Sequence, residues 1–392
     1  MNASLDSTRP SEKPVWPVLA VTCMVGTFAL VVGYTYPALS FAMEAAGFSR
    51  TVIGLQTAMS GLGVAISAVL TPPVAIRVGP WRLGVVAGII TIVTLISFGF
   101  TEPGYVWFLL RFILGAAISA LFVLSETWLN ELAPPALRGR LVAVYTTTVA
   151  AMFGVGPLLI PFVGYSGTAP FVIVGGFATL LLLPLFLLRG QVPPLEPARN
   201  RDMLAVFWII PVLIAAVATF GIFDGATMGL WVVYGVELGY SDTIASWTLS
   251  AAILGNLFLQ IPIGWLADRM SRKTLLSICV GASVLGASLI PFLDLDAWYI
   301  WPFLMVWGGM CFGIYTIALT VLGEHLRGAL LISANAAFGL MWGVGAILGG
   351  ALAGGMMDLV GPYGLPAFIF AIFLILFVMT VTIAPVRAVQ KT

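Results

Sequence analysis

Twelve apolar runs of membrane-spanning length constrain the fold of this chain more than any other feature of its sequence. A membrane-spanning helix needs about 20 apolar residues to cross a hydrocarbon core of about 30 Å. Charged residues make up only 8% of the 392 residues, against about 25% in soluble domains, so a polar surface cannot cover these runs. We therefore expect an all-α membrane protein. The predicted spans are residues 15–37, 52–71, 83–101, 105–129, 140–164, 168–188, 204–234, 243–266, 274–293, 298–322, 329–357 and 363–384.

The positions of Lys and Arg test this topology, because the cytoplasmic loops of membrane proteins carry an excess of them. With twelve spans, both termini share one side of the membrane. All basic residues except Arg50 and Arg111 then fall in the two tails and in alternate loops. The sequence therefore predicts a multi-pass protein of the cell (inner) membrane with both termini cytoplasmic. Its first span is expected to be retained rather than cleaved as a signal peptide.

A weak internal repeat relates the two halves of the chain. The pair Arg138-Gly139 precedes Gly154-Val-Gly156 by the same spacing that separates Arg327-Gly328 from Gly343-Val-Gly345, and the two copies are 189 residues apart. Duplicated membrane units are typical of transporters. The predicted organisation is an N-terminal six-helix half at residues 1–188, a cytoplasmic linker at 189–203 and a C-terminal six-helix half at 204–392.

Composition and motifs argue against several other classes of function. A net charge of +1 without a basic run offers no surface to nucleic acid. The three cysteines lie inside apolar runs and His325 is the only histidine, so neither disulfides nor a metal site is expected. The sequence contains no nucleophile motif of a hydrolase and no phosphate-binding loop. We therefore expect no enzyme and no cofactor.

The loop between the predicted eighth and ninth spans carries an acid among basic residues, in the sequence Gly264-Trp-Leu-Ala-Asp268-Arg269-Met-Ser-Arg272-Lys273. An acid at a helix end among cations can form a breakable ion-pair lock between helices. This loop resembles the signature loop of the major facilitator superfamily, although Ser271 replaces a glycine. The resemblance implies that Asp268 and its basic neighbours hold the cytoplasmic side closed in the outward-facing state. Alternatively, these charges only set the topology.

Two further runs resemble one branch of that superfamily. They are Ser125-Glu126-Thr-Trp128-Leu129-Asn130, followed by Leu137-Arg138-Gly139-Arg140, and Asn335-Ala-Ala-Phe338-Gly-Leu-Met-Trp342-Gly-Val-Gly345. Both are similar to the YcaD-like branch, whose members are predicted bacterial transporters with poorly known substrates. The superfamily resemblance covers essentially the whole chain and implies the major facilitator fold of two six-helix pseudo-repeats. We include Arg138 and Arg140 in the cytoplasmic lock.

Arg111 lies inside the predicted fourth span, where an arginine costs about 2.5–3.5 kcal/mol on insertion scales. It should therefore face the protein interior and have a partner. The spacing of Arg111 and Gly115 resembles the fourth-span motif of proton-coupled facilitators, which implies a role in proton transfer, although Leu114 replaces a polar residue. The alternative is that Arg111 snorkels outward to the membrane surface.

Asp224 is the only acid well inside the predicted seventh span. It shares one helix face with Phe220, Thr227 and Trp231, which recur at helical spacing and are candidates for lining a substrate cavity. A dry site favours the protonated form of a carboxyl, so Asp224 is a candidate for proton exchange. The alternative is a structural hydrogen bond or an ion pair.

Glu126 is the third candidate for proton coupling, near the cytoplasmic boundary of the fourth span. It lies roughly 22 Å along the helix from Arg111, so these two side chains cannot touch. A salt bridge from Glu126 to Arg138 or Arg140 is the alternative to a functional role.

Other residues at helical spacing are candidates for lining a substrate cavity, or else for packing between helices. They are Gln56, Ser60, Asn256, Gln260, Trp307, Cys311, Tyr315, Asn335, Phe338 and Trp342. Glycines crowd the eleventh span, where close packing of helix backbones is expected. The scarcity of charge predicts a small neutral or amphipathic substrate, because a polyanion would need several arginines.

Taken together, these patterns predict a secondary active transporter that works by alternating access, as a monomer in the lipid bilayer. Protons are the expected coupling ion. Export is favoured because Gly154-Val-Gly156-Pro157 resembles the antiporter motif of the fifth span, although its closing Gly-Gly is absent. The alternative is a metabolite facilitator or a proton-coupled uptake symporter on the same fold.

Overall fold

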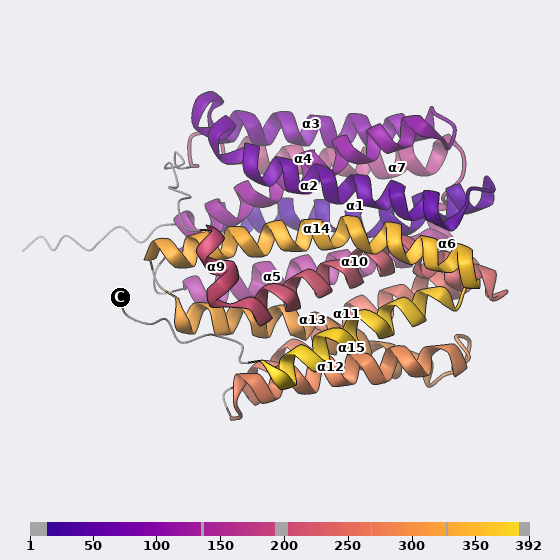
Figure 1. The fold of residues 1–392 in the computed structure, drawn as a ribbon. Helices are drawn as coiled ribbons and strands as arrows, with labels where there is room; N and C mark the ends of the chain where they lie inside the picture. The colour runs from indigo at the N-terminus through magenta and orange to yellow at the C-terminus, as the bar shows by residue number, and fades with distance from the viewer. Residues whose placement is uncertain (1–13, 135–136, 193–202, 268, 327, 384–392) are drawn as a thin grey trace, which may run out of the picture.

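The computed structural model of this protein describes residues 14–134, 137–192, 203–267, 269–326 and 328–383. Over these residues the chain forms helices joined by short turns, with no strand (Figure 1). Twelve of the described helical stretches are long and apolar enough to cross a membrane. The predicted all-α fold with twelve spans is therefore confirmed.

The first six spans are joined by short connections. At the sharpest of these, Gly79 adopts a φ of +92° that favours glycine, and Pro80 starts the next helix immediately. The spans are α1 (Trp16–Ala45), α2 (Arg50–Val78), α3 (Pro80–Gly99), α4 (Tyr105–Leu132), α5 (Arg138–Val155) continued by η1 (Gly156–Leu159) and α6 (Ile160–Val163), and α7 (Thr168–Ala178) continued by η2 (Thr179–Leu181) and α8 (Leu182–Leu187).

The second half begins with a short extra helix, so the predicted span 204–234 is wrong at its start. Pro211 has no N–H to continue the preceding helix, and Ile210 before it leaves the helical region at φ −126°, ψ 53°. The elements are α9 (Met203–Ile209), α10 (Pro211–Glu237), α11 (Asp242–Ala267), α12 (Arg272–Leu289) with η3 (Ile290–Phe292), α13 (Ile300–His325), α14 (Gly328–Val360) and α15 (Gly364–Thr382).

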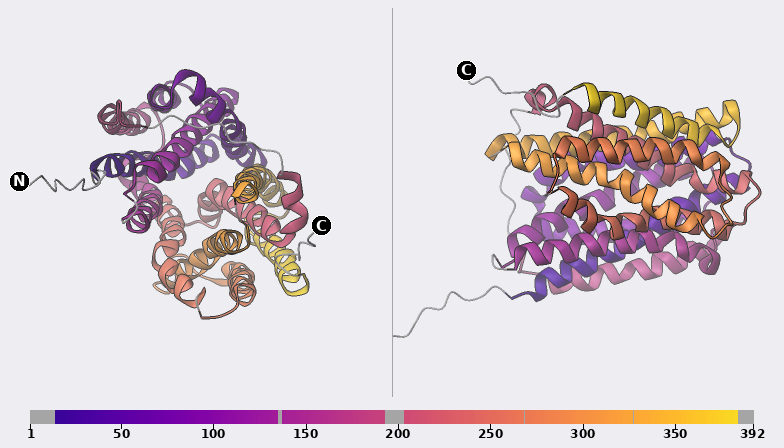
Figure 2. Two further views of the ribbon diagram at one scale, coloured as in Figure 1. Left: turned by 90° about the vertical axis from the view of Figure 1, so that its left-hand side faces the viewer. Right: turned by 90° about the horizontal axis from the view of Figure 1, so that it is seen from below.

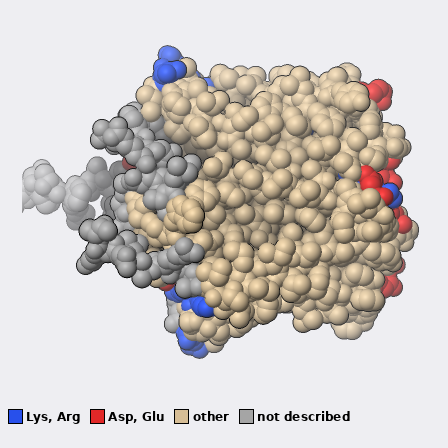
Figure 3. Space-filling view, in the orientation of Figure 1, with Lys and Arg blue, Asp and Glu red and all other residues tan. Residues whose placement is uncertain are grey.

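The spans lie roughly side by side, with most of the first six in the upper part of Figure 1 and most of the last six in the lower part. Figure 2 shows the same bundle seen along and across the helices. The described chain starts and finishes at the same end, on the left of Figure 1. The blue surface in Figure 3 lies largely at this end, and the red surface lies at the opposite end.

We name the two ends of the bundle by these charges. The basic end holds Arg77, Arg82, Arg138, Arg140, Arg189, Arg269, Arg272 and Lys273. The acidic end holds Glu44, Glu102, Glu237, Asp242, Asp294, Asp296 and Asp358, together with Arg50.

Glycines bring α14 into close contact with a helix of each half. A Cβ at Gly345 would meet the backbone of Ala218 in α10, and a Cβ at Gly350 would meet that of Gly54 in α2. Gly354 faces the Arg50 carbonyl in the same way. The predicted packing role of these α14 glycines is therefore confirmed, and α2 and α14 form a major contact between the two halves.

A first prediction concerns this contact. Replacing Gly54 with leucine should keep α2 and α14 apart, because even a Cβ at this position would meet the Gly350 carbonyl. We expect a cysteine introduced at Ser40, which is buried nearby, to react much faster with a hydrophilic maleimide in this variant than in its parent. The measurement uses a background without the three native cysteines.

Gly176→Leu is the matched control for Gly54→Leu, because a Cβ at Gly176 would meet nothing within 4 Å. It should leave the reaction rate at the introduced cysteine unchanged. Equal rates in Gly54→Leu and its parent would show that this glycine contact does not hold the halves together.

Candidate functional site

Asp224 lies at the middle of α10, half-buried between the helices of the second half. The Trp342 indole of α14 lies within hydrogen-bonding reach of its carboxyl group. Phe220, one turn away, has its ring centroid 5.3 Å from that of Phe312 and 5.4 Å from that of Tyr315, both on α13. The structure thus brings together four predicted site residues from three helices: Phe220, Asp224, Tyr315 and Trp342.

Glu126 of α4 faces this cluster from the first half. Its side chain is exposed and lies within electrostatic range of Tyr145 in α5 and Tyr315 in α13. In the part of the chain that the structure describes, no ion pair joins Glu126 to Arg138 or Arg140. Arg138 instead donates to the backbone carbonyl of Asn130 at 2.9 Å. The alternative interpretation of Glu126 as a salt-bridge partner is therefore wrong for this conformation.

Thr227 and Trp231 continue the Asp224 face of α10 toward the acidic end, where the halves are closely packed. Both are buried, with 1% of their surface exposed. The Trp231 indole donates to the Thr248 hydroxyl at 3.0 Å. In this conformation these two predicted cavity residues are sealed, and only the part of the face nearer the basic end is accessible.

Arg111 is almost completely buried, so the alternative that it snorkels to the membrane surface is wrong. Its guanidinium carbon lies 3.8 Å from the ring centroid of Tyr36 in α1. The Tyr36 hydroxyl donates to Ser60 of α2 at 3.1 Å. Among the described residues, no hydrogen bond or ion pair joins Arg111 to Asp224 or Glu126.

The predicted lock lies at the basic end, between α11 and α12. Asp268 lies outside the described residues. Arg269 stacks on the Trp265 ring at 3.7 Å, Arg272 forms an ion pair with Glu324 of α13 at 2.7 Å, and Lys273 donates to the Val381 carbonyl at 3.3 Å. A Cβ at Gly264 would meet nothing within 4 Å. These contacts of the basic side chains all stay within the second half, and Arg140 of the first half is exposed.

The remaining cavity candidates occupy different environments. Gln56 is 1% exposed, and both polar atoms of its amide lack a hydrogen-bond partner among the described residues. Asn256 and Gln260 are half-buried along α11, and Asn335 is exposed on α14. Phe338 is buried and therefore packs in the core of the second half.

A polar network that was not predicted from the sequence joins the two halves at the acidic end. Arg50 of α2 forms ion pairs with Glu237 of α10 and with Asp358 of α14, the latter at 3.6 Å. The two Asp358 oxygens also accept from the backbone N–H groups of Arg50 and Thr51, at 3.0 and 2.9 Å. The sequence did contain an indication of this network, because Arg50 is the one basic residue among the acids of that end.

Further contacts between the halves also lie on the acidic side of the bundle. Tyr165, between α6 and α7, donates to Asp242 of α11 at 2.8 Å. Burial and this hydrogen bond raise the pKa of Tyr165 to about 12, so it remains a donor at neutral pH. Ser40 of α1 donates to the Gly229 carbonyl of α10 at 2.7 Å. These hydrogen bonds and ion pairs between the halves all lie toward the acidic end, so the two halves are held closed there.

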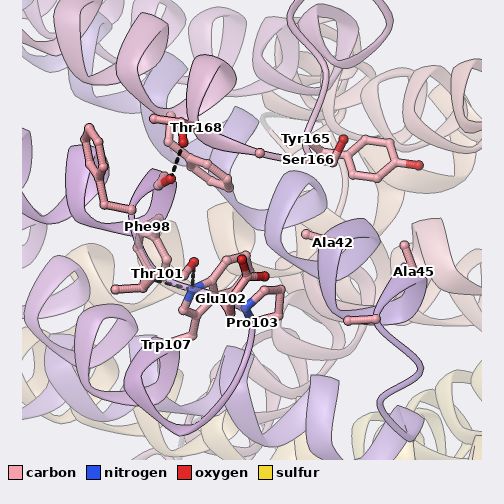
Figure 4. A pocket seen from close by; sticks show the side chains of 15 residues that line it. Ala42, Ala45, Phe98, Thr101, Glu102, Pro103, Trp107, Tyr165, Ser166 and Thr168 are labelled. Atoms are coloured by element: carbon pink, nitrogen blue, oxygen red, sulfur yellow. Dashed lines mark hydrogen bonds between the residues drawn. The ribbon is translucent and has the colours of Figure 1, made fainter.

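Two pockets open at the acidic end. One, of about 480 Å³, lies in the first half between α1, the α3–α4 connection and the start of α7 (Figure 4). It is lined by Phe98, Trp107, Tyr165 and Thr168 among others, and it contains none of the predicted site residues. The other, of about 300 Å³, is lined by Arg50, Glu237 and Asp358 of the closing network. Neither pocket reaches Asp224.

Comparison with known proteins gives consistent matches over nearly the whole chain. A family model described as the Major Facilitator Superfamily matches residues 21–326 and 213–392. The uncharacterized MFS-type transporter YfkF of Bacillus subtilis is 26% identical over 338 residues, which cover 83% of this chain and 85% of the relative. The uncharacterized MFS-type transporter YcaD of Escherichia coli is 25% identical over 342 residues, covering 86% and 87%.

Solved structures share the fold at low sequence identity. A mutant of the nucleoside transporter NupG superimposes with a TM-score of 0.78 at 16% identity, covering 93% of this chain and 99% of that one. A bacterial homologue of the human lysosomal transporter Spinster, in an inward-facing and unoccupied conformation, gives 0.73 at 14% identity, covering 95% and 96%. At such identities the similarity concerns the fold alone.

Proposed function

This chain belongs to the major facilitator superfamily of secondary transporters, and we propose that it moves a small neutral or amphipathic organic molecule across the membrane by alternating access. In this proposal the halves 1–188 and 204–392 rock about the site between them, as a monomer in the cell (inner) membrane. The observation that carries the proposal is the placement of Asp224 at the middle of α10, next to Trp342 and one turn from Phe220, whose ring contacts Tyr315.

The composition of this site supports an amphipathic substrate. Its wall in the second half is aromatic, because the Phe220 ring contacts the rings of both Phe312 and Tyr315. The charged groups of the site are two acidic residues, Asp224 from the second half and Glu126 from the first. Aromatic walls with few polar groups are typical of small-molecule sites.

We further propose that transport is coupled to protons and runs as export, with Asp224 as the proton-carrying group. A half-buried carboxyl at mid-membrane can exchange a proton when the site opens to either side. Glu126 lies between Asp224 and the basic end, so it can pass protons to that side. Arg111 has no contact with Asp224 in this conformation, and its role in coupling therefore depends on the other conformations of the cycle. A facilitator or uptake symporter remains the second candidate.

The proposed orientation places the basic end in the cytoplasm, together with both termini, following the excess of Lys and Arg there. The conformation described here, closed at the acidic end, is then the inward-open one. We propose that the cytoplasmic lock engages when the transporter faces outward. It consists of Gly264, Asp268, Arg269, Arg272 and Lys273 in the second half, with Arg138 and Arg140 in the first.

A combined binding and flux experiment tests the proposal. The purified protein in detergent is screened by thermal shift against metabolites and amphipathic drugs, and each hit is then followed in proteoliposomes with and without a pH gradient. We expect a stabilising hit whose flux follows the proton gradient. Flux that equilibrates the same molecule at the same rate without a gradient would instead establish a facilitator.

A further inference from the structure

Arg111 is a buried charged residue that has no counter-charge in the described part of the chain. It is 1% exposed, and its Nε and Nη2 atoms have no hydrogen-bond partner there. No carboxylate of the described residues forms an ion pair with it. A buried charge without a counter-charge is strongly destabilising, as mutations that break a buried ion pair show. An ionisable residue of this kind inside a membrane span is therefore a candidate for binding a ligand that supplies the missing negative charge.

Tyr36 supplies only part of what the guanidinium needs. Its ring covers one face at 3.8 Å, and its hydroxyl lies within hydrogen-bonding reach of the guanidinium. That hydroxyl in turn donates to Ser60. A neutral phenol cannot balance the charge, so the donors at Nε and Nη2 remain directed at no acceptor.

Gln56 lies level with Arg111 on the neighbouring helix. Helices α2 and α4 run in the same direction, and residues 55 apart face each other: a Cβ at Gly115 would meet the backbone of Ser60, and Ser119 donates to the Val64 carbonyl at 3.2 Å. One turn toward the acidic end, the same offset pairs Gln56 with Arg111. Gln56 is also 1% exposed, and its amide nitrogen and oxygen both lack hydrogen-bond partners among the described residues.

We propose that Arg111 and Gln56 form the binding site for a single carboxylate group carried by the substrate. A guanidinium presents a planar fork of N–H donors that matches a carboxylate, and the Gln56 amide adds a neutral donor beside it. The single cation balances one negative charge and leaves no partner for a second. The substrate is then an apolar molecule with one carboxylate rather than a phosphate ester or a dicarboxylate.

Access to this site is expected only in the opposite conformation of the transporter. Arg111 and Gln56 lie in the parts of α4 and α2 nearer the acidic end, and Gln56 is two residues from Gly54, which packs against Gly350 of α14. Opening that contact exposes the pair. The carboxylate is therefore bound or released from the acidic end.

This inference rests on the proposed transport function and narrows its substrate class. The test uses the purified full-length protein, with octanoate and phenylacetate as probes and with octanol and phenylacetamide as matched neutral probes. Chloride distinguishes a carboxylate site from a general anion site. We expect each carboxylate to bind at least about tenfold more tightly than its neutral partner, as for a hydrogen bond to a charged group.

Arg111→Met is the first variant, because methionine keeps an apolar chain of similar reach. It should remove the preference for carboxylates. In the ligand-free protein it should melt no lower than the wild type, because it removes an uncompensated buried charge. An Arg111 that served only the structure would give the reverse result, with a lower melting temperature and no change in carboxylate preference.

Gln56→Leu and Arg77→Met complete the set of variants. Gln56→Leu should weaken the carboxylate preference in part, and it keeps the test valid if Arg111→Met fails to fold. Arg77 is exposed at the basic end, so Arg77→Met should bind the probes as the wild type does. Equal affinity for acids and their neutral partners in the wild type would overturn the inference, as would equal stabilisation by chloride. Continued proton-driven flux of a neutral molecule in Arg111→Met would then leave the proposed function standing without it.

Discussion

Transport driven by a proton gradient is expected to be lost when Asp224 is replaced with asparagine. The amide keeps the size and hydrogen-bonding capacity of the carboxylic acid but cannot release a proton. Exchange of substrate for substrate across a membrane without a pH gradient should continue, because that reaction needs no net proton movement. The measurement compares gradient-driven flux and equilibrium exchange in proteoliposomes, and we expect at least about a hundredfold loss in the first, the scale on which proton-transfer groups act.

Asp224→Glu and Glu102→Gln serve as controls for this result. Asp224→Glu restores a titratable group one methylene longer and should recover part of the coupled flux. Glu102 is exposed at the acidic end, outside the contact between the halves, so Glu102→Gln should transport as the wild type does. Unchanged gradient-driven flux in Asp224→Asn would remove Asp224 from the mechanism.

The twelve spans were predictable because hydropathy alone determines which segments can cross a bilayer. The failure at the start of the seventh span came from one local effect, the missing N–H of Pro211, which a hydropathy window does not register. The packing of the α14 glycines was also predictable. A stripe of glycines on an apolar helix indicates close packing against another helix, because glycines let the two backbones approach each other.

The site was only partly predictable. Helical spacing placed Phe220 and Asp224 on one face, but the contacts of Asp224 with Trp342 and of Phe220 with Tyr315 depend on how α10 packs against α13 and α14. Spacing also grouped Thr227 and Trp231 with Asp224, although the two are sealed in this conformation. Periodicity gives the face of a helix, whereas the conformational state of the protein decides which part of that face is accessible.

The closing network at the acidic end was not predictable for a related reason. Arg50 and Asp358 are 308 residues apart in the chain, and they meet only because the two halves approach each other there. In the sequence each is simply a charge next to a loop. Their contact also belongs to one state of a transporter, and a sequence pattern describes no single state.

Replacing Asp358 with asparagine is therefore expected to shift the protein toward the state open at the acidic end. Asp358 accepts hydrogen bonds from the backbone of Arg50 and Thr51 and from the Thr51 hydroxyl at 2.5 Å, so one half caps the first turn of a helix in the other. Losing a charged acceptor of this kind costs about 2 kcal/mol, which corresponds to roughly a thirtyfold shift between the two states.

The shift can be measured with the cysteine introduced at Ser40, which the closed acidic end buries. Its reaction with a hydrophilic maleimide should accelerate by a similar factor in Asp358→Asn. Glu237→Gln should act in the same direction, because it removes the second carboxylate that holds Arg50. Asp296→Asn is the matched control, since Asp296 is exposed at the same end, on the η3–α13 connection. Equal labelling rates in the wild type and the three variants would show that the network forms as a result of closure and does not stabilise the closed state.

Slower transport in Asp358→Asn would then follow from the cycle itself. A transporter that spends more time open at the acidic end returns less often to the conformation open at the basic end, so its turnover falls even though no substrate contact has changed. A second mutation that restores the equilibrium between the two conformations should therefore restore the transport rate. Weakening the opposite lock with Arg272→Gln in the same protein is therefore expected to recover part of the lost turnover, and a further loss in the double variant would contradict the assignment of the two ends as opposing gates.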